Sequence, residues 1–555
     1  MDRTFRTSTT TSLVRAFAIG GALLTGFEAA GLGSTVFAAE TPVAQDAAQA
    51  DRVRMVGDFL HYVLIAKPDL AEAAGQKLFA SGITDGELAD IVSENDLGDK
   101  VERSLRRGRG MAGVGPMVTE FEQRLESGRL DLARDQDRIK EAIGMLDGSL
   151  RAQMMGKRRL IEAGEYAIPQ LLDVIVSGRD PQLEIRVTSV IEEIKRQAVL
   201  PLCAALPEVS PSVQVKVCRM LSNIGWPTAI PTLLDVATTR GTTPEVKDAA
   251  MTAFRRLGGT STDVSFAYTA LAKKFFDEEQ SLVAYPGDPA NMVWSYGPHS
   301  GLVQTPVATS IFCQVMAMRN ARAALVADSS NRTALAVYVA SDLRRENQMG
   351  VNESDPFADD AKYSPQFFAT AAGSSTARSV LAMAIDSKDT ALVRDAIEAL
   401  GMTVERGRMV AAGGRQPLLE CLRYPDRRAQ YDTALVLGQA ISEALGDKRG
   451  ITRFGHAYAP LDEALARAVV DLSGRPWPAI DLGFRRERLG DIATENLTHF
   501  MTSLAMAGRF NLHVDVLRGD NDHHRAEAAF KATALALRSA LVRRGAEVPS
   551  TKGVL

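Results

Sequence analysis

Apolar side chains recur every three or four residues along most of this chain, which predicts α-helices with one buried face rather than strands. The pattern is clearest between residues 156 and 260, where Leu171, Leu172 and Ile175 fall on a single helical stripe. Residues 51–150 carry the same pattern, interrupted at Gly and Pro residues. We therefore predict a mainly α fold.

Two sets of residues recur at nearly constant spacing within this helical pattern. Three prolines, each near the start of an apolar run, are separated by 32 and 30 residues, and three basic residues between them by 30 and 31 residues. Proline is tolerated in the first turn of a helix, because its missing N–H would be unpaired there in any case. A fixed period with two helices per unit is typical of an α-solenoid, in which stacked helix pairs share one core. The residues are Pro169, Pro201 and Pro231, and Arg186, Lys216 and Lys247.

Residues 156–260 resemble HEAT repeats of the short type. In that family a first helix bearing Arg or Lys ends in Ile-Gly, and a second helix opens with Ala-x-Pro-x-Leu-Leu, as at residues 229–234. The pattern returns at residues 392–422, and residues 311–346 resemble one tetratricopeptide unit. On this basis the chain is identified as a bacterial exported HEAT-repeat protein. The resemblance implies an armadillo-like α-solenoid with a concave face that binds a partner.

The C-terminal region has a different pattern, in which two short apolar segments, 478–484 and 510–519, each precede a helical segment. This order predicts strands followed by helices, and hence a small α/β region. The predicted organisation is a signal peptide at 1–38, a linker at 39–50, a helical region at 51–150, HEAT-like repeats at 151–260, a tetratricopeptide-like region at 261–350, a linker at 351–378, further HEAT-like helices at 379–445 and the C-terminal region at 446–555.

The N-terminus has the layout of a secretory signal peptide. A basic stretch containing Arg3, Arg6 and Arg15 precedes a short apolar run and an Ala-x-Ala-like site near Ala38. The alternative is a retained amphipathic anchor. No later stretch is long and apolar enough to predict a second membrane span. We therefore expect an exported protein of the periplasm or cell envelope without a transmembrane segment after the signal is removed.

Charge and cysteine content change this picture little. The formal net charge is −4, so no basic excess predicts binding to nucleic acid. None of the four cysteines forms a C-x-x-C pair, and buried thiols are favoured over disulfides, although Cys203 and Cys218 fall on neighbouring predicted helices. The other two are Cys313 and Cys421.

Two short motifs resemble catalytic signatures but stand in the wrong context. Residues 108–113 match G-x-G-x-x-G, yet no strand is predicted before them, so a basic turn is the simpler interpretation. Asp522-His523-His524 matches the Asp-His-His triplet of a phosphoesterase family but lacks the further aspartates of such a site. A helix start with solvated histidines, and Asp522 as N-cap, is favoured. The sequence therefore predicts no catalytic, cofactor-binding or metal-ligating residue and no cofactor.

The segment with the most unusual surface is 284–306, which is rich in proline and aromatic residues. Loops on rigid scaffolds often carry recognition, and aromatic side chains are common interface anchors. The alternative is a β-hairpin that turns at Gly297-Pro298 and buries its tryptophan. The candidate partner-binding residues are Tyr285, Trp294, Tyr296 and His299.

Three functions follow from these observations. The first is a non-catalytic scaffold of the cell envelope that binds an unidentified protein partner through its helical repeats. The second is an enzyme with an unrecognised active site in the C-terminal region and the solenoid as its targeting arm. The third is a structural component of the envelope. The missing catalytic motifs favour the first.

Overall fold

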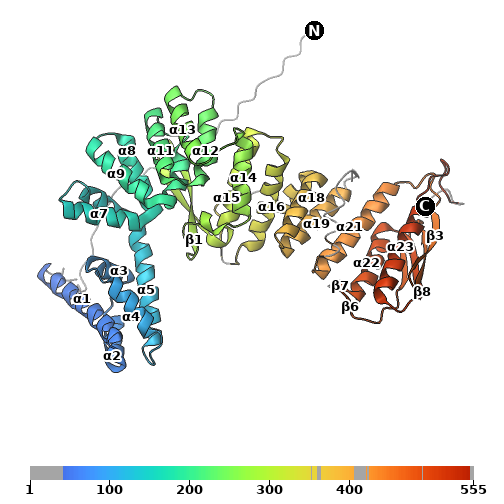
Figure 1. The fold of residues 1–555 in the computed structure, drawn as a ribbon, viewed down its shortest axis with the longest axis horizontal. Helices are drawn as coiled ribbons and strands as arrows, with labels where there is room; N and C mark the ends of the chain where they lie inside the picture. Colours follow the sequence, from blue (N-terminus) through green and yellow to red (C-terminus); the bar gives the residue numbers. More distant parts are fainter. Residues whose placement is uncertain are drawn as a thin grey trace, which may run out of the picture. The chain divides into compact units, whose positions relative to one another are not determined.

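The computed structural model describes residues 42–351, 353–358, 364–405, 421, 424–490 and 492–550 (Figure 1). The predicted signal peptide and its cleavage site lie outside these residues. The chain forms two compact units, one ending at Arg129 and the other beginning at Leu130. Among the described residues, no helix is long and apolar enough to cross a membrane.

The first unit is built from amphipathic helices around a small aromatic core. The rings of Phe59 and Phe121, both fully buried, lie 5.5 Å apart between centroids. The G-x-G-x-x-G match covers the end of α4 and the turn after it, so a helix rather than a strand precedes it. This placement agrees with a simple turn. The helices are α1 (Pro42–Leu64), α2 (Pro68–Ala80), α3 (Asp85–Glu94), α4 (Gly98–Gly108) and α5 (Gly115–Arg134).

The second unit begins with helices that follow the predicted period. Each of the three recurring prolines is the second or third residue of its helix, which confirms their placement in first turns. Leu233, at the centre of the repeated pattern, is fully buried. The helices are α6 (Gln136–Met145), α7 (Leu150–Ala163), α8 (Ile168–Ser177), α9 (Pro181–Ile194), α10 (Val199–Ala205), α11 (Pro211–Ile224), α12 (Ile230–Thr238), α13 (Pro244–Arg256) and α14 (Val264–Phe276).

Contacts between neighbouring helices explain two of the recurring basic residues. Lys216 on α11 forms an ion pair with Glu184 on α9 at 2.6 Å. One unit earlier, Arg186 on α9 pairs with Asp147 and donates to the carbonyl of Leu146 at 2.8 Å. In these two units the recurring position thus joins α11 to α9, and α9 to the turn after α6.

A β-hairpin interrupts the helices after α14. Strands β1 (Ala290–Gly297) and β2 (Gly301–Ala308) pair antiparallel. Met292 and Trp294 pack into the core of the preceding helices, whereas Val293 and Val307 pack into the core of the helices that follow. Both faces of the hairpin are therefore used in packing, and it joins two hydrophobic cores.

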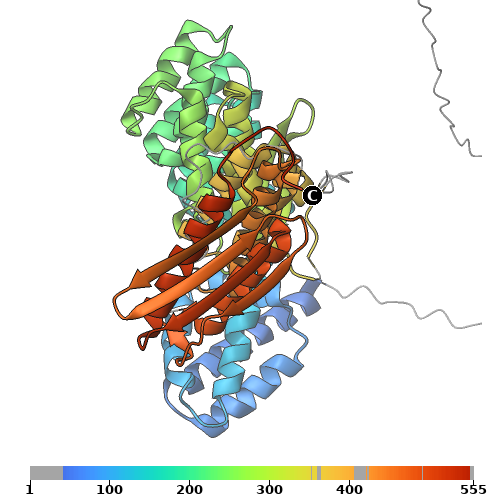
Figure 2. The ribbon, with the colours of Figure 1, turned by 90° about the vertical axis from the view of Figure 1, so that its right-hand side faces the viewer.

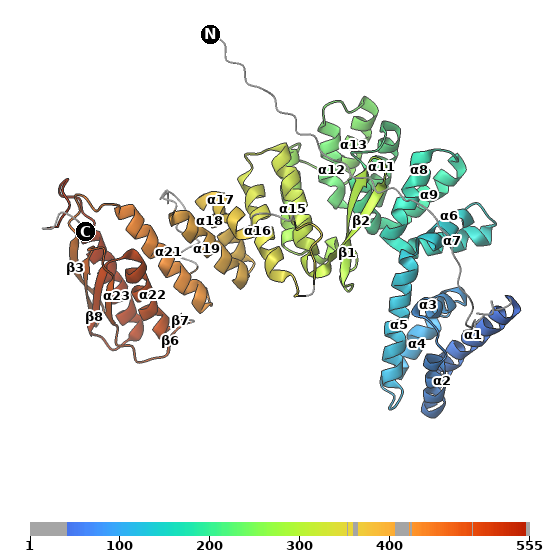
Figure 3. The ribbon, with the colours of Figure 1, turned by 180° about the vertical axis from the view of Figure 1, so that it is seen from behind.

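Further helices continue beyond the hairpin (Figure 3). Helix α17 lies within 351–378, the stretch expected to be a linker. A second buried core contains Phe312, Leu343, Leu381 and Ile397. The helices are α15 (Thr309–Ala327), α16 (Arg332–Gln348), α17 (Pro365–Ala371), α18 (Gly373–Asp386), α19 (Thr390–Glu405) and α21 (Arg427–Leu445).

The C-terminal region is a four-stranded sheet with helices packed on one face (Figure 2). The strand order is β3-β4-β8-β5, and only the β8–β5 pair is parallel. Gly455 allows α23 to approach, since a Cβ there would lie 2.0 Å from the carbonyl oxygen of Ala536. The elements are β3 (Phe454–Leu461), β4 (Ala464–Asp471), β5 (Trp477–Asp481), β6 (Arg488–Leu489), β7 (Ile492–Ala493), α22 (Thr494–Gly508), β8 (Asn511–Arg518) and α23 (Asp522–Ala540).

The chain is thus mainly α-helical with a small α/β region at its C-terminus, as the sequence predicts at this level. The sequence interpretation missed β3 and β4 of the main sheet and the short pair β6 and β7. Ala and Gly fill most of the buried positions of β3 and β4 because α23 packs closely on them, so the apolar alternation typical of a strand is weak.

Candidate active site

A cluster of charged and imidazole groups surrounds the N-terminus of α23. Asn521 is the N-cap, and its side-chain oxygen accepts a hydrogen bond from the backbone N–H of His523 at 3.0 Å. Asp522, expected to be the N-cap, is instead the first residue of the helix. The turn between β3 and β4 brings Asp462 and Glu463 to the same place, and Asp462 adopts a left-handed conformation there (φ 46°).

His524 links the helix to this turn. Its Nδ1 lies 2.7 Å from Oε2 of Glu463, and its Nε2 lies 3.5 Å from Oδ2 of Asp462. The other oxygen of Glu463 accepts hydrogen bonds from the backbone N–H groups of Asp520 at 3.1 Å and Asn521 at 2.8 Å. Both oxygens of the Glu463 carboxylate therefore have hydrogen-bond partners.

These contacts shift the acid strengths of both partners. Backbone donation from Asn521, followed by the His524 contact, lowers the pKa of Glu463 to about 2. The hydrogen bond to Glu463 is in turn the main cause that raises the pKa of His524. Both groups are reached by solvent, and His524 retains its proton to a higher pH than a free imidazole would.

The same three groups offer ligand atoms within 4.8 Å of one another, from Asp462, Glu463 and His524. Carboxylate oxygens and an imidazole nitrogen are donors that a divalent cation accepts. The sequence interpretation named no metal ligand here. The geometry makes these residues the ones that would hold a cation in this part of the chain.

His523 differs from its neighbour because it is largely exposed. Its Nε2 lies 3.6 Å from Oε2 of Glu527, one helical turn further on. Glu527 also pairs with Lys531 at 2.7 Å, and this contact is the main cause that lowers the pKa of the Glu527 carboxyl. His523 therefore presents a ring to solvent beside a carboxylate that stays ionised.

Buried polar contacts fix the loop after β5 to the first turn of α23. The Oδ2 atom of Asp522, which is only 2% exposed, accepts hydrogen bonds from the backbone N–H groups of Arg485 at 3.0 Å and Arg486 at 2.7 Å. Arg525 donates to the carbonyls of Leu482 and Gly519 at 3.0 and 2.8 Å. The loop, which carries two exposed arginines, is thereby held near the two histidines.

This arrangement combines imidazole, carboxylate and guanidinium groups at one end of the sheet. Histidine is the side chain best suited to proton transfer near neutral pH. Arginine is well suited to binding phosphate and carboxylate groups. The site can therefore bind an anionic substrate and transfer protons on it.

The four candidate partner-binding residues lie in the hairpin region. Trp294 is 3% exposed and donates from Nε1 to Oε2 of Glu165 at 2.8 Å, as in the alternative with a buried tryptophan. Tyr285 and Tyr296 are half-buried, and the Tyr285 ring stacks on Tyr166 with centroids 5.9 Å apart. His299 is exposed in the turn. A role of these residues in partner binding stays a prediction.

Sequence reasoning considered His523 and His524 but interpreted them as solvated. It missed Asp462 and Glu463 because it did not predict the β3–β4 hairpin. The available signal was a pair of eight-residue segments separated by Asp-Glu, with small residues at every second position.

Comparison with known proteins identifies the family of the C-terminal region. The family model for imidazoleglycerol-phosphate dehydratase matches residues 425–537. The dehydratase of Maudiozyma humilis is 45% identical over 195 residues, covering 34% of this chain and 85% of the relative. That of Eremothecium gossypii is 58% identical over 142 residues, covering 25% of this chain and 64% of the relative. The chain therefore belongs to the imidazoleglycerol-phosphate dehydratase family.

A solved structure of the Staphylococcus aureus dehydratase matches with 39% identity, covering 21% of this chain and 70% of that chain, at a TM-score of 0.21. The chain spans 64% of the length of the Eremothecium gossypii relative.

These matches correct four expectations. The identification as a HEAT-repeat protein is wrong, and so are the non-catalytic scaffold and the expectation that the chain is not an enzyme. The expected location in the periplasm or cell envelope, which was inferred from the signal-peptide layout of residues 1–38, is also wrong, because the chain matches the dehydratases of Eremothecium gossypii and Saccharomyces cerevisiae. The HEAT-repeat identification failed because regular spacing of helix pairs indicates only how the helices pack. Unrelated families can share that packing.

Proposed function

We propose that the α/β domain containing residues 425–537 catalyses the dehydration of imidazoleglycerol phosphate. The observation that carries this proposal is its sequence identity of 58% to the dehydratase of Eremothecium gossypii. The site at the start of α23 supports it, because a substrate with a phosphate group and an eliminated hydroxyl requires anion binding and proton transfer.

Loss of water from a carbon chain requires one group to accept a proton and another to donate one. A base removes a proton from carbon, the freed electron pair forms a C=C bond, and the C–O bond of the adjacent carbon breaks. The hydroxyl leaves as water after taking a proton from an acid, and the enol product rearranges to a ketone. We assign the base to His523, whose ring is largely exposed. We assign the acid to His524, which Glu463 keeps protonated as long as no cation occupies its ring nitrogen.

The arginine-bearing loop gives the substrate its orientation. Asp522 and Arg525 fix the backbone of this loop, so its position does not depend on the substrate. The guanidinium groups of Arg485 and Arg486 are exposed and lie in the same loop as these anchored N–H groups. We assign phosphate binding to this loop.

The proposal is tested by incubating the purified full chain with imidazoleglycerol phosphate, with and without a divalent cation, and following a product lighter by one water in a mass spectrometer. His523→Gln and His524→Gln are each expected to lower kcat by about 100-fold or more. His513→Gln, on an exposed position of β8, is the matched control and should retain turnover. A wild-type rate equal to that of buffer would contradict the proposal.

We also propose that helices α7 to α14 form an α-solenoid. The recurring prolines at helix starts and the shared core from Ile139 to Leu257 support this arrangement. In a solenoid, each helix pair is stabilised mainly by its neighbours. Deleting the single unit of residues 211–242 should therefore leave a folded chain that melts cooperatively at a lower temperature, whereas a non-repetitive core would collapse.

A further inference from the structure

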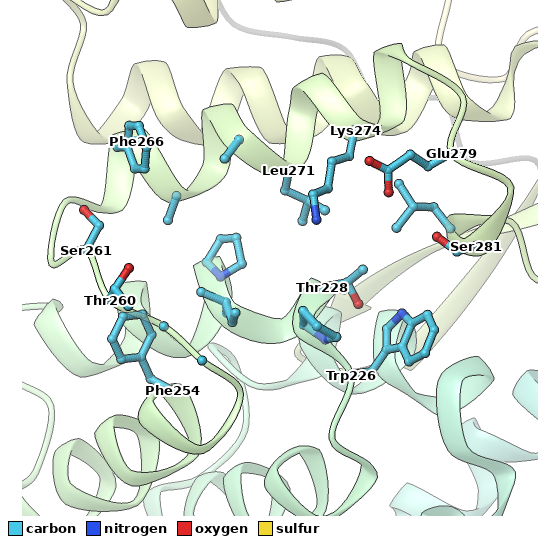
Figure 4. Close-up of a pocket in the computed structure, with 18 residues that line it drawn as sticks. Trp226, Thr228, Phe254, Thr260, Ser261, Phe266, Leu271, Lys274, Glu279 and Ser281 are labelled. Carbon is cyan, nitrogen blue, oxygen red and sulfur yellow. The ribbon is translucent and has the colours of Figure 1, made fainter.

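The helical part of the second unit contains a pocket of about 460 Å³ between α12 and α14 (Figure 4). We call it the α12–α14 pocket. Pockets of this size accommodate small organic ligands. It lies far along the sequence from the dehydratase domain, and no residue of the candidate active site lines it.

One end of the pocket is mainly aromatic, with the hydroxyl groups of Thr260 and Ser261 beside the rings. Phe254 and Phe266 lie at this end in Figure 4, and Leu271 lies between them and the opposite end. Phe266 is 60% exposed, although phenylalanine side chains are usually buried. An exposed aromatic ring in a concave site provides surface for a ligand rather than for the core.

The opposite end carries one positive and one negative side chain. Figure 4 shows the amino group of Lys274 and the carboxylate of Glu279 directed to this end of the pocket, above Trp226 and Thr228. Within the part of the chain that the structure describes, neither side chain has an ion-pair or hydrogen-bond partner. Two opposite charges therefore stand near each other without neutralising each other through direct contact.

The backbone fixes these two charges in one turn. Helix α14 ends at Phe276, and the N–H of Glu279 donates to the carbonyl of Lys274 at 3.2 Å. Glu278 supplies the left-handed residue of this helix terminus (φ 55°). This terminus therefore fixes the backbone positions from which the two exposed side chains extend.

From this geometry we infer that the α12–α14 pocket binds a free α-amino acid with a large apolar side chain. An α-amino acid carries an ammonium and a carboxylate on one carbon, which matches Glu279 and Lys274 at one end. Its side chain extends from the same carbon and matches the aromatic end. Burial of an apolar side chain then supplies affinity, and the two charges supply selectivity.

Other simple ligands satisfy only part of the pocket. A neutral hydrophobe would use neither of the two exposed charges. A fatty acid or an amine would pair with one charge and be repelled by the other. A zwitterion with its charges at one end satisfies both. This inference concerns a site separate from the proposed dehydratase activity, and its test does not depend on that activity.

The test is a calorimetric titration of the full chain with L-phenylalanine. Saturable binding with a Kd of about 1 mM or tighter is expected. L-Phenylalaninamide, which lacks the carboxylate, and N-acetyl-L-phenylalanine, which lacks the ammonium, should each bind about tenfold more weakly. Glycine, which has the charges without the apolar side chain, should show no saturable binding.

Two variants assign the charges. Lys274→Gln should weaken L-phenylalanine about tenfold but leave the affinity for the amide unchanged, because the amide has no carboxylate to lose. Glu279→Gln should do the same with respect to the N-acetyl compound. Lys273→Gln, an exposed neighbour on α14 that does not line the pocket, is the matched control. Unchanged melting temperatures would show that the variants are folded.

The inference is overturned if L-phenylalanine shows no saturable binding, or if the amide and the N-acetyl compound bind as tightly as the amino acid. It is also overturned if Lys274→Gln and Lys273→Gln bind L-phenylalanine equally well. Each of these results would leave the pocket as an apolar gap at a helix terminus.

Discussion

The helical part of the second unit and the α/β domain differ in what their sequences reveal. In the helices, the recurring prolines and apolar stripes indicate the architecture directly, because each helix packs mainly on its neighbours in sequence. In the α/β domain, the key contact joins residues 61 positions apart, His524 and Glu463. Local sequence pattern therefore predicts the architecture of the helical part, to which no reaction is assigned. It misses the contacts of the α/β domain, where the candidate active site lies.

The largest effect is expected from a substitution in the β1–β2 hairpin of the helical region. Trp294→Ala removes a buried indole and its hydrogen bond to Glu165, and should lower the free energy of unfolding by about 3–5 kcal/mol. Ser295→Ala, exposed on the same strand, is the control and should change it little. Thermal melting followed by far-ultraviolet circular dichroism measures both. Equal melting temperatures for the two variants would show that the hairpin does not hold the two helical cores together.

A second prediction concerns pH. Burial raises the pKa of Glu165 to about 7, against the smaller opposing effects of the Trp294 hydrogen bond and the Arg134 charge. Tyr166, Tyr285 and Asp288 also belong to this buried cluster. Because the folded chain binds this proton more tightly than the unfolded chain, stability should fall as pH rises from about 4.5 to about 7 and then level off.

Glu165→Gln should remove this dependence, since an amide does not titrate. The variant is expected to gain about 1–3 kcal/mol relative to the wild type between pH 5 and pH 8. Glu208→Gln, an exposed glutamate without a resolved partner, is the matched control and should follow the wild type. The assignment would be contradicted if Glu165→Gln and the wild type lost the same amount of stability between pH 5 and pH 8.

The same contrast explains how much could be predicted from the sequence. Pro169 and Pro231 could be placed because a proline in a helix is confined to its first turn. The strands β5 and β8 could be found from short apolar segments that each precede a helical segment. Strands β3 and β4 could not, because most of their buried positions are Gly and Ala, which allow α23 to approach closely.

The site itself depends on tertiary contacts that no local pattern encodes. The hydrogen bonds from Arg485 and Arg486 to Asp522 span 37 and 36 residues. The tight pairing of Glu463 with His524 follows only once β3 and β4 form a hairpin beside α23. The two histidines were visible in the sequence, but Glu463, the partner that raises the pKa of His524, was not.

A third prediction tests whether the buried aspartate positions the loop. Asp522→Ala leaves two backbone N–H groups without their acceptor and should cost about 1–3 kcal/mol of stability. We expect KM for imidazoleglycerol phosphate to rise more than kcat falls, because the loop is assigned to phosphate binding rather than proton transfer. Asp447→Ala, at an exposed aspartate that pairs with Arg449 outside the site, is the control. A fall in kcat with unchanged KM would show that Asp522 acts on the histidines instead.

The smallest expected effect compares two helix caps, one in each region. Asn521 caps α23 and Thr243 caps α13, and each side chain accepts a hydrogen bond from a backbone N–H of its helix. Replacing either by Ala should cost about 1 kcal/mol of stability. Only Asn521→Ala should also lower the turnover of imidazoleglycerol phosphate, because its helix start carries His523 and His524. Equal loss of turnover in both variants would mean that activity follows overall stability, and the assignment of the site to the start of α23 would lose its support.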